Sequence, residues 1–409
     1  MGPAPATDMP SRPKAVLLDF YGTLVEGDGG RIERICAGIA LAAGATPEKI
    51  HADWSAVFVD LWTRSWGDDF RLMREVVTAS LQDVMDRHGV GGSAAEFCGE
   101  LFAYWRRPAI CPETRSVLAH CPVPVCIVSD VDDADIEAAM AYQGLSFDAV
   151  VTSQACRAYK PRPEMFDEAL RVLGLGAGEV IHVGDSIRRD VGGALAVGIG
   201  ALWINRGQPQ GQPPPAGARE APDLAGVLEL FGLREAADEP VLIEPCQALG
   251  PALIEYVDEF RRSGERFWQN ERGPIRDDVA GYIRRRHERA RGVNVPPGLV
   301  PDSHFWLVRR ERILGVARLR HELTDRLRVE GGHIGYDVRP SERGRGHATR
   351  LLALTLGKAR QIGLARALVT CDKDNLASAC VIRKNGGQLD SEGPSPDTGK
   401  VVQRYWIDL

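Results

Sequence analysis

Four short polar clusters each follow an apolar run in the first half of the sequence. They read DFYGT from Asp19, SD from Ser129, YKPRPE from Tyr159 and GDSIRRDVGGA from Gly184. A carboxylate can attack an electrophilic centre and form a covalent intermediate that water later cleaves. Asp19 is the candidate nucleophile, because it directly follows the apolar run AVLL.

The other clusters could complete a hydrolytic site around Asp19. A second carboxylate, Asp185, would repel Asp19 unless a cation lay between them, and oxygen ligands of this kind favour Mg²⁺. The hydroxyls of Thr23 and Ser129 could donate hydrogen bonds to a bound oxyanion. Lys160 would neutralise that oxyanion and keep Asp19 ionised.

Asp190 lies about one helical turn beyond Asp185 and could orient the lysine or a metal-bound water. Each of these signals is weak when taken singly, because an Asp after a strand is more often a turn former and Lys-Pro is usually exposed loop. The presence of all four clusters in this order is more specific.

The elements between the clusters predict how the side chains meet. Short apolar runs alternate with helical patterns up to about residue 205, in the order AVLLDF, VCIVSD, DAVVTS, VIHVGDS and ALWIN. This alternation predicts an α/β fold with a Rossmann-like, doubly wound parallel sheet. The carboxyl ends of its strands would bring the clusters together at one edge.

Residues from about 26 to 115 have mostly helical patterns and predict a helical cap inserted after the first strand. Four tryptophans fall inside this region. They are expected to form the core of the cap, and an aromatic substrate wall is the alternative; the residues are Trp54, Trp62, Trp66 and Trp105.

The segment RGQPQGQPPPAGARE, residues 206–220, predicts a loop because it is rich in Pro, Gly and Gln. An amphipathic helix in PDLAGVLELFG would end a first domain of residues 12–233, and residues 234–239 would form a linker. Residues 240–409 then predict a separate α+β domain with a mainly antiparallel sheet. Its helices are expected at 246–263, 274–291, 347–362 and 375–384, and its strands in FWLVRR, ILGVARLR, HIGYDV, ALVTC and QRYWIDL.

In their order, the four clusters resemble the motifs of the haloacid dehalogenase (HAD) superfamily of aspartate-nucleophile hydrolases, over residues 14 to about 233. The resemblance implies a Mg²⁺ site formed by Asp19, the backbone carbonyl of Tyr21 and Asp185. Phosphatases of this superfamily typically have Asp-x-Asp, where the second acid protonates the leaving oxygen. The 2-haloacid dehalogenases have Asp-x-Tyr, because halide leaves without a proton.

Tyr21 therefore favours a dehalogenase, whereas the acids of GDSIRRDVGGA favour a Mg²⁺-dependent phosphatase. We favour the phosphatase, because a missing general acid typically costs about 10² to 10⁴ in rate, while a phosphate dianion without the metal would face bare carboxylates. The leaving-group proton would come from water or the cap, or the substrate would have a good leaving group such as an acyl phosphate. Asp130, where relatives often have Asn, is interpreted as surface variation.

A second motif lies in SERGRGHATRLLALTLGKA. Its glycines would let backbone N–H groups and a helix N-terminus surround a pyrophosphate, although a plain loop is the alternative. The pattern RxxGxA, with the following ALVTCD and DNLASACVIRKNGG, resembles the GCN5-related N-acetyltransferase (GNAT) family over about residues 240–409. The resemblance implies an acetyl-CoA site formed by Val338, Arg343, Gly344, Arg345, Gly346, His347, Ala348 and Asn375.

Proton transfer in this second domain is open. Many GNAT relatives use a Tyr seven residues after the Asn as the acid, and Ile382 occupies that position here. Glu330, His333 and Asp337 are candidate bases and Tyr405 is a candidate acid, but each is at least as well explained as a structural residue.

Composition limits the partners. A net charge of −6 gives no basic footprint for nucleic acid. The nine cysteines form no Cys-x-x-Cys pair, so they are expected to be reduced thiols of a cytoplasmic protein. Neither a secretion signal nor a membrane-spanning run is expected. The oligomeric state cannot be derived from the sequence.

The sequence thus predicts a bifunctional enzyme, a phosphatase for a small phosphorylated metabolite fused to an acetyl-CoA-dependent N-acetyltransferase of a primary amine. The fusion suggests that both domains act on one metabolite, such as a phosphorylated amino sugar. The alternatives for the first domain are a 2-haloacid dehalogenase and a non-catalytic binding module that regulates the acetyltransferase.

Overall fold

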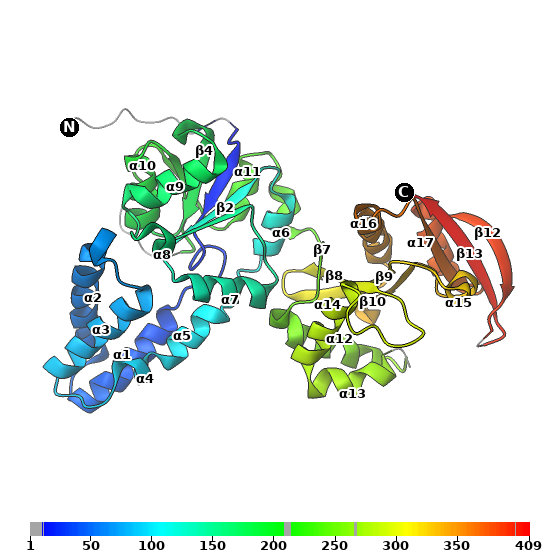
Figure 1. Cartoon of the computed structure of the whole chain (residues 1–409), viewed down its shortest axis with the longest axis horizontal. Coiled ribbons are helices and arrows are strands. Elements are labelled where there is room, and N and C mark those ends of the chain that lie inside the picture. The colour runs from blue at the N-terminus through cyan, green and yellow to red at the C-terminus, as the bar shows by residue number, and fades with distance from the viewer. Residues whose placement is uncertain (1–9, 11, 208–213, 266–267, 397) are drawn as a thin grey trace. The chain divides into compact units, whose positions relative to one another are not determined.

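The computed structural model describes residues 10, 12–207, 214–265, 268–396 and 398–409 of the chain. The chain divides into two compact units, Met1–Asp238 and Glu239–Leu409. Figure 1 shows both units and labels their elements.

The first unit is built on a parallel sheet of six strands in the order β3-β2-β1-β4-β5-β6. Asp19 follows β1 directly, and Ser129 ends β2. The polar clusters therefore lie at the carboxyl end of the sheet. The strands are β1 Ala15–Leu18, β2 Val125–Ser129, β3 Ala149–Thr152, β4 Val180–Gly184, β5 Gly200–Ile204 and β6 Ala218–Ala221.

Both faces of this sheet are buried, as the near-continuous apolar runs require. In β1, Val16 and Leu18 belong to one core cluster, while Ala15 and Leu17 belong to the cluster on the other face. The helices α6 Thr114–His120, α7 Asp133–Gln143 and α11 Ala225–Glu229 contribute to the first cluster, and α9 Pro163–Leu173 and α10 Gly192–Ala196 contribute to the second. The predicted doubly wound sheet is confirmed.

Five helices between β1 and β2 form the cap, which has a core of its own. Three of its tryptophans are buried as predicted (Trp54, Trp62 and Trp105), but Trp66 is 48% exposed. The Trp66 ring lies 4.0 Å from the guanidinium of Arg162, so it packs at the surface instead. The helices are α1 Gly29–Ala43, α2 Pro47–Arg64, α3 Met73–Arg87, α4 Ala94–Phe97 and α5 Gly99–Arg106.

The cap is tied to the sheet domain by hydrogen bonds. The carboxylate of Asp132, just after β2, accepts the N–H groups of Met73 and Arg74 at 2.7 and 3.1 Å, where α3 begins. Tyr159 donates its hydroxyl to the carbonyl of Arg71 at 2.7 Å. These hydrogen bonds hold the start of α3 and the residues before it against the sheet domain.

Two segments near the carboxyl end of the first unit differ from the sequence prediction. The predicted loop 206–220 includes the start of β6, which pairs with β5 although Ala-Arg-Glu-Ala has little intrinsic strand preference; residues 208–213 lie outside the described residues. The predicted linker contains a 3₁₀ helix, Arg234–Asp238, that packs on the first unit. Ser116 donates to the carbonyl of Ala236 at 2.8 Å.

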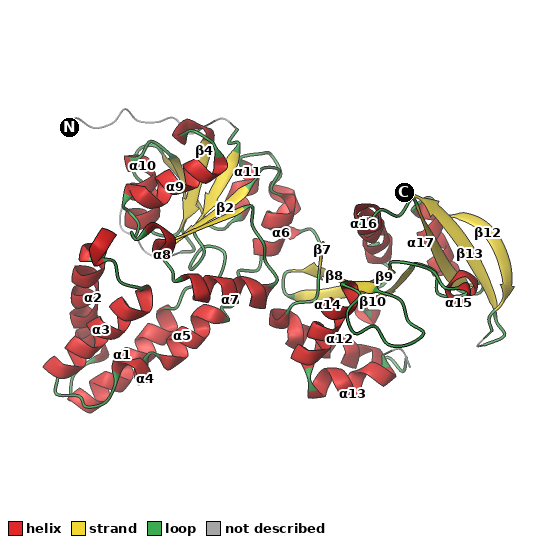
Figure 2. Ribbon diagram, in the orientation of Figure 1, coloured by secondary structure: helices red, strands yellow, loops and turns green. Residues whose placement is uncertain are grey.

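The second unit contains two antiparallel sheets, in the orders β10-β9-β8-β7 and β11-β13-β12 (Figure 2). Its strands are β7 Val241–Ile243, β8 Asp302–Arg309, β9 Arg312–Arg320, β10 Ile334–Val338, β11 Arg366–Asp372, β12 Gln388–Pro394 and β13 Val401–Asp408. Its helices are α12 Gly250–Arg262, α13 Gln269–Asp277, α14 Val279–Ala290, α15 Asp325–Val329, α16 His347–Gln361 and α17 Leu376–Lys384. The predicted α+β architecture is confirmed.

The two sheets meet where β10 begins. His333 donates its N–H to the carbonyl of Leu368 at 2.7 Å, and its ring Nδ1 accepts the N–H of Leu368 at 2.9 Å. Strand β12 was not predicted, because its sequence QLDSEGP is polar and mostly exposed and lacks an apolar alternation.

The nine cysteines are free thiols. In the described part of the chain, no helix combines the length and the apolar character needed to cross a membrane.

Candidate active sites

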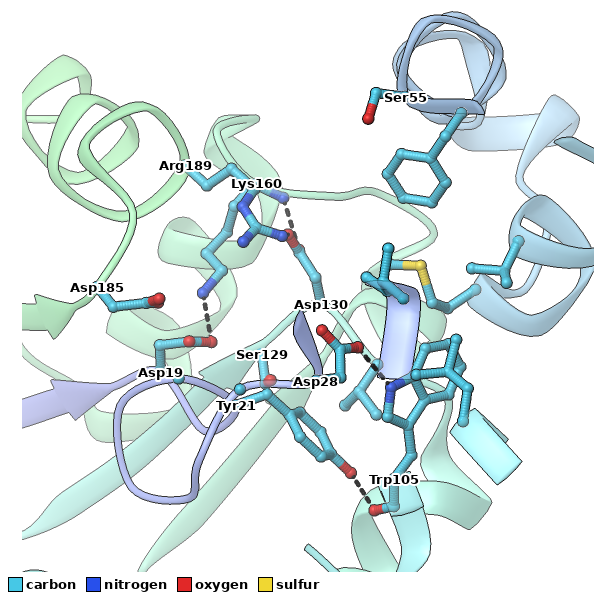
Figure 3. Close-up of a pocket in the computed structure, with 18 of the residues that line it drawn as sticks. Asp19, Tyr21, Asp28, Ser55, Trp105, Ser129, Asp130, Lys160, Asp185 and Arg189 are labelled. Atoms are coloured by element: carbon cyan, nitrogen blue, oxygen red, sulfur yellow. Dashed lines mark hydrogen bonds and ion pairs between the residues drawn. The ribbon is translucent and has the colours of Figure 1, made fainter. Parts of the chain in front are cut away.

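Lys160 links the polar clusters at the carboxyl end of the sheet (Figure 3). Its ammonium donates to Asp19 Oδ1 at 2.7 Å, to Asp190 Oδ1 at 2.6 Å and to the carbonyl of Val128 at 2.9 Å. Burial would lower the pKa of Lys160, but Asp19 and Asp190 outweigh it and raise that pKa above its usual value. The lysine is therefore charged, and it holds a carboxylate on each side.

Asp190 is positioned by a single π-helical turn, Ile187–Val191, that follows β4. Its Oδ2 accepts the N–H of Ser186 at 2.9 Å, and its Oδ1 also lies 3.1 Å from Nε2 of His182. Burial raises the pKa of Asp190, yet Lys160 and His182 outweigh burial and lower it. Of the two roles predicted for Asp190, these contacts match the one that orients the lysine.

The carboxylates of Asp19, Asp185 and Asp190 form a group that could hold a metal ion, with one oxygen from each within 4.8 Å of the others. Asp185 Oδ1 is buried and has no hydrogen-bond partner among the described residues. Burial and the charge of Asp19 raise the pKa of Asp185 to about 7. A divalent cation would satisfy this oxygen and relieve the repulsion, so the oxygen donors fit Mg²⁺.

Gly22 allows Asp185 to approach the loop after β1. Its φ is +87°, and a Cβ built on it would lie 2.5 Å from Asp185 Oδ2. Both the left-handed backbone and the close approach exclude a side chain here.

The side chain of Tyr21 is committed to the cap. Its hydroxyl donates to the main-chain carbonyl of Trp105 at 2.6 Å, and burial raises the pKa of the phenol above its usual value. The phenol is therefore a poor proton donor for a leaving group. The metal-ligand role of the Tyr21 carbonyl stays a prediction.

The two predicted hydroxyl donors lie in different places. Ser129 is buried at the end of β2 and lines a cavity of about 310 Å³ together with Asp19 and Lys160. Thr23 is not among the described residues that line this cavity, although its buried Oγ1 has no hydrogen-bond partner among them. Ser129 therefore lines the cavity, whereas Thr23 is not part of its described lining.

The cavity lies between the sheet and the cap. Its polar side contains Asp130 and Arg189 as well as the residues described above. The cap contributes an apolar wall of Ile32, Trp54, Phe58, Met73, Val77, Leu101 and Trp105. Two of the predicted core tryptophans therefore also face the cavity.

The interpretation of Asp130 as surface variation is wrong. Its side chain is only 5% exposed, Oδ1 accepts the N–H of Lys160 at 2.8 Å, and Oδ2 lies 3.8 Å from Arg189. Burial raises the pKa of Asp130 to about 6, against the opposing effects of Lys160 and Arg189. Arg189 was not predicted, although its position next to Asp190 in the fourth cluster was an available signal.

In the second unit, the glycine-rich turn leads directly into α16, which begins at His347. Gly344 and Gly346 have φ of +76° and +82°, and apart from their chain neighbours no heavy atom of the described residues lies within 4 Å of a Cβ built on either. Arg343 forms a bidentate ion pair with Glu265 at 2.8 and 2.9 Å. Its guanidinium is therefore already paired, and its main-chain N–H donates to the carbonyl of Pro340 at 3.4 Å.

The neighbouring predicted cofactor residues also have partners within the chain. Arg345 donates to Glu342 at 3.1 Å, and Val338 accepts a hydrogen bond from Arg343 through its carbonyl. His347 is buried next to the partly buried Ala348. Asn375 caps α17, because its Oδ1 accepts the N–H of Ser378 at 3.0 Å.

Among the candidate proton-transfer groups, Asp337 has the most perturbed environment. It accepts hydrogen bonds from the hydroxyl of Tyr256 and, at 3.4 Å, from the indole of Trp268. Burial raises the pKa of Asp337 to about 7. Sequence reasoning gave no signal for Tyr256 or Trp268, which come from distant α12 and the start of α13.

The other three candidates have structural partners. Nδ1 of His333 accepts the N–H of Leu368, and burial lowers its pKa to about 4. Tyr405 donates to Gln403 at 2.7 Å, and Glu330 accepts from Ser395. Asp337 is thus the best placed of the predicted bases.

Comparison with protein families distinguishes the two units. A model of haloacid dehalogenase-like hydrolases matches residues 13–198, and a model of the GNAT acetyltransferase domain matches residues 255–388. The chain joins a HAD-like hydrolase domain to a GNAT acetyltransferase domain. The predicted family assignment is confirmed for both domains.

Relatives of the hydrolase domain differ in their activities. The chain is 29% identical over 210 residues to (S)-2-haloacid dehalogenase 4A of Burkholderia cepacia, covering 49% of this chain and 85% of the relative. It is also 29% identical over 149 residues to phosphoserine phosphatase of Thermus thermophilus, covering 35% and 57%. The solved L-2-haloacid dehalogenase of Xanthobacter autotrophicus is 22% identical, with a TM-score of 0.44, and covers 54% of this chain and 98% of its own.

Proposed function

We propose that the hydrolase domain is a Mg²⁺-dependent phosphatase of a small phosphorylated metabolite. One arrangement carries this proposal: Lys160 holds Asp19, and the buried Oδ1 of the neighbouring Asp185 has no hydrogen-bond partner among the residues that the structure describes. Phosphoryl transfer by this route needs both a nucleophile and a carboxylate oxygen that is able to bind the metal ion.

The charge of the cavity supports a metal-dependent reaction. Four carboxylates line it, from Asp19, Asp28, Asp130 and Asp185, against the two cations Lys160 and Arg189. A phosphate dianion would be repelled by this surplus of negative charge. Mg²⁺, held by Asp19, Asp185 and the Tyr21 carbonyl, would neutralise part of it and polarise the phosphoryl group.

The chain's own residues then have distinct roles. A carboxylate oxygen of Asp19 attacks phosphorus as the bond to the leaving oxygen breaks, and water later attacks phosphorus to release phosphate and regenerate Asp19. Lys160 holds the Asp19 carboxylate in place by a hydrogen bond at 2.7 Å, and the Ser129 hydroxyl donates to a phosphoryl oxygen. Because Tyr21 is committed to Trp105, the leaving oxygen takes its proton from water or the cap, or leaves as a weakly basic anion.

Dehalogenation of a 2-haloacid is the second candidate, because Tyr21 is the residue that it would require. The same Asp19 would attack carbon and expel halide. However, both the substrate carboxylate and the departing halide are anions, and Asp130 and Asp185 add negative charge to the cavity. We therefore place dehalogenation second.

For the GNAT domain, we propose acetyl-CoA-dependent N-acetylation of a primary amine. The turn Gly344–Gly346 leads into the first turn of α16, whose N-cap residue Gly346 makes no side-chain capping hydrogen bond. Backbone N–H groups at such a helix N-terminus can bind a pyrophosphate. Asp337 is the proposed base, because its pKa of about 7 lets it accept a proton near neutral pH.

The test of the hydrolase proposal is Mg²⁺-dependent phosphate release from a panel of phosphate esters, with Asp19→Asn as the control. Halide release from 2-haloacids is measured in parallel. Halide release alone would establish dehalogenation. Neither product above the Asp19→Asn background would support the alternative of a non-catalytic binding module.

The test of the acetyltransferase proposal is calorimetry with acetyl-CoA. Gly346→Glu should abolish binding, because it adds a negative charge and a side chain at a φ of +82°. Gly399→Glu is the matched control, since Gly399 also has a positive φ of +70° but lies outside the turn, and apart from its chain neighbours no described residue lies within 4 Å of a Cβ built on it. Binding that Gly346→Glu leaves unchanged would refute the site.

A further inference from the structure

The cavity of the hydrolase domain has two chemically different halves. The half formed by the strand ends contains Asp19, Ser129, Asp130, Lys160, Asp185 and Arg189. The half formed by the cap is lined by the side chains of Trp54, Phe58, Met73, Val77, Leu101 and Trp105. A substrate whose phosphate lies against Asp19 must therefore place the rest of its body against apolar and aromatic side chains.

The hydrogen-bond donors along the cap wall already have partners. The indole N–H of Trp54 donates to Ser80 at 2.9 Å, and that of Trp105 donates to Asp28 at 2.8 Å. The hydroxyl of Tyr21 donates to the Trp105 carbonyl at 2.6 Å. The indole and phenol donors therefore cannot bond a substrate hydroxyl without losing their present partners, whereas the Asp28 carboxylate could accept one further hydrogen bond next to Trp105.

Two polar residues of the cap differ from this pattern. His51 and Ser55 line the cavity one turn apart on α2, and both are exposed, so they lie where the cavity opens to solvent. In Figure 3, Ser55 lies on the cap side, well separated from Asp19 and Lys160. Apart from Asp28 beside Trp105, the described wall between that opening and the strand ends is apolar.

We propose that the substrate is a phosphate monoester of a compact apolar alcohol, alicyclic or aromatic, and not a sugar phosphate. This inference rests on the proposed phosphatase function and names its substrate class. A hydroxyl held against the apolar wall would lose its hydrogen bonds to water without replacement, whereas a hydrocarbon ring would gain from burial. A volume of about 310 Å³ accommodates one such ring beside the phosphate.

This conclusion differs from the amino sugar phosphate suggested by the fusion of the two domains. An amino sugar carries several hydroxyls and a cation around its ring, and on the described cap side only Asp28 and, at the opening, His51 and Ser55 could bond them. The apolar wall that forms the rest of this side could not. The fusion of two domains in one chain does not determine which side chains line the site of either domain.

The experiment compares cyclohexyl phosphate with myo-inositol 1-phosphate at saturating Mg²⁺, using the full chain. Both are esters of secondary ring alcohols of equal ring size, so they differ mainly in the hydroxyls that meet the wall. The inositol leaving group is the less basic of the two, so intrinsic reactivity favours it. We expect kcat/KM to favour cyclohexyl phosphate by at least about 100-fold.

Two variants test whether the wall causes the preference. Phe58→Gln puts a polar amide on the wall and should reduce the ratio by about tenfold. Phe97→Gln is the matched control, because Phe97 belongs to the same cap core and is not among the described cavity-lining residues. This control should leave the ratio unchanged.

The other outcomes separate the inference from the function on which it rests. An equal or higher kcat/KM for inositol phosphate, or a ratio that Phe97→Gln lowers as much as Phe58→Gln does, overturns the substrate class. Hydrolysis of acetyl phosphate alone also overturns it and leaves the phosphatase intact. No phosphate release from any of the three above the Asp19→Asn background overturns both.

Discussion

Tyr21 donates its phenolic hydrogen bond to the main-chain carbonyl of Trp105, at 2.6 Å, and so connects the loop after β1 to cap helix α5. In a phosphatase with Asp-x-Asp, this position supplies the acid for the leaving group. Here the side chain lines the cavity and holds the cap by this hydrogen bond instead. The tyrosine is therefore a positioning residue.

The first prediction concerns this position. Tyr21→Asp restores a carboxyl group and should raise the hydrolysis of alkyl phosphates relative to aryl phosphates, by up to about 10²-fold, because only basic leaving groups need the proton. Tyr21→Phe should leave the preference for aryl esters as it is. Steady-state kinetics on a series of esters graded by leaving-group pKa measure both effects. A larger aryl preference in Tyr21→Phe than in the unsubstituted chain would show that the phenol itself donates the proton to alkyl leaving groups.

The second prediction concerns Lys160, which is buried between two carboxylates. Lys160→Met leaves Asp19 and Asp190 without their cation and should lower the free energy of unfolding of this domain by about 3–5 kcal/mol. Urea titrations followed by tryptophan fluorescence measure the change. Adding Asp190→Asn should recover part of the loss, and a double variant less stable than Lys160→Met would contradict the electrostatic explanation.

The third prediction concerns Gly22. Gly22→Ala should weaken Mg²⁺ binding by about 10- to 100-fold, because its Cβ would displace Asp185. Gly44→Ala is the control for backbone strain alone, since Gly44 has a φ of +65° and open space around it. Calorimetric titration with Mg²⁺ compares the two. Equal Mg²⁺ affinities would remove Asp185 from the metal site.

The fourth prediction uses the pH dependence of Asp130. Because burial raises its pKa to about 6, above the unfolded value, the folded state binds this proton more tightly. Ionised Asp130 therefore destabilises the fold increasingly as the pH rises toward and past about 6. Asp130→Asn should raise the unfolding temperature more at about pH 8 than at about pH 5. Thermal unfolding of the hydrolase domain measures this, and the transition of that domain is identified by its shift with Mg²⁺. An increase in unfolding temperature that is larger at about pH 5 than at about pH 8 would contradict the prediction.

The fifth prediction concerns the acetyltransferase. Asp337 must be ionised to accept a proton, so acetyl transfer should fall as the pH drops below about 7. Asp337→Asn should lower kcat by about 10²-fold or more and remove this acid limb. A variant that loses rate but keeps the limb would assign Asp337 a structural role only. Acetyl-CoA calorimetry on the variant checks that the fold is retained.

The sheet of the first unit was predictable because its strands are near-continuous apolar runs, buried on both faces. The convergence of Asp19, Lys160 and Asp190 followed from that topology. By contrast, the pairing of β6 and the polar edge strand β12 depends on tertiary partners, which leave little trace in local sequence.

The environment of a side chain was harder to predict than its position in the chain. Asp130 looked like a surface residue, yet the fold places it in the cavity between Lys160 and Arg189. Arg343 was expected to be part of the acetyl-CoA site, but its guanidinium pairs with Glu265, which follows α12 in the chain. Both outcomes depend on residues distant in sequence.

The central claim is that Asp19 becomes covalently phosphorylated. The most direct measurement is rapid acid quench of the Mg²⁺-loaded chain with radiolabelled acetyl phosphate, followed by mapping of the labelled peptide. The account predicts label on the peptide that contains Asp19, released by hydroxylamine and absent from Asp19→Asn. Label that persists in Asp19→Asn, or phosphate release without any labelled protein, would contradict it.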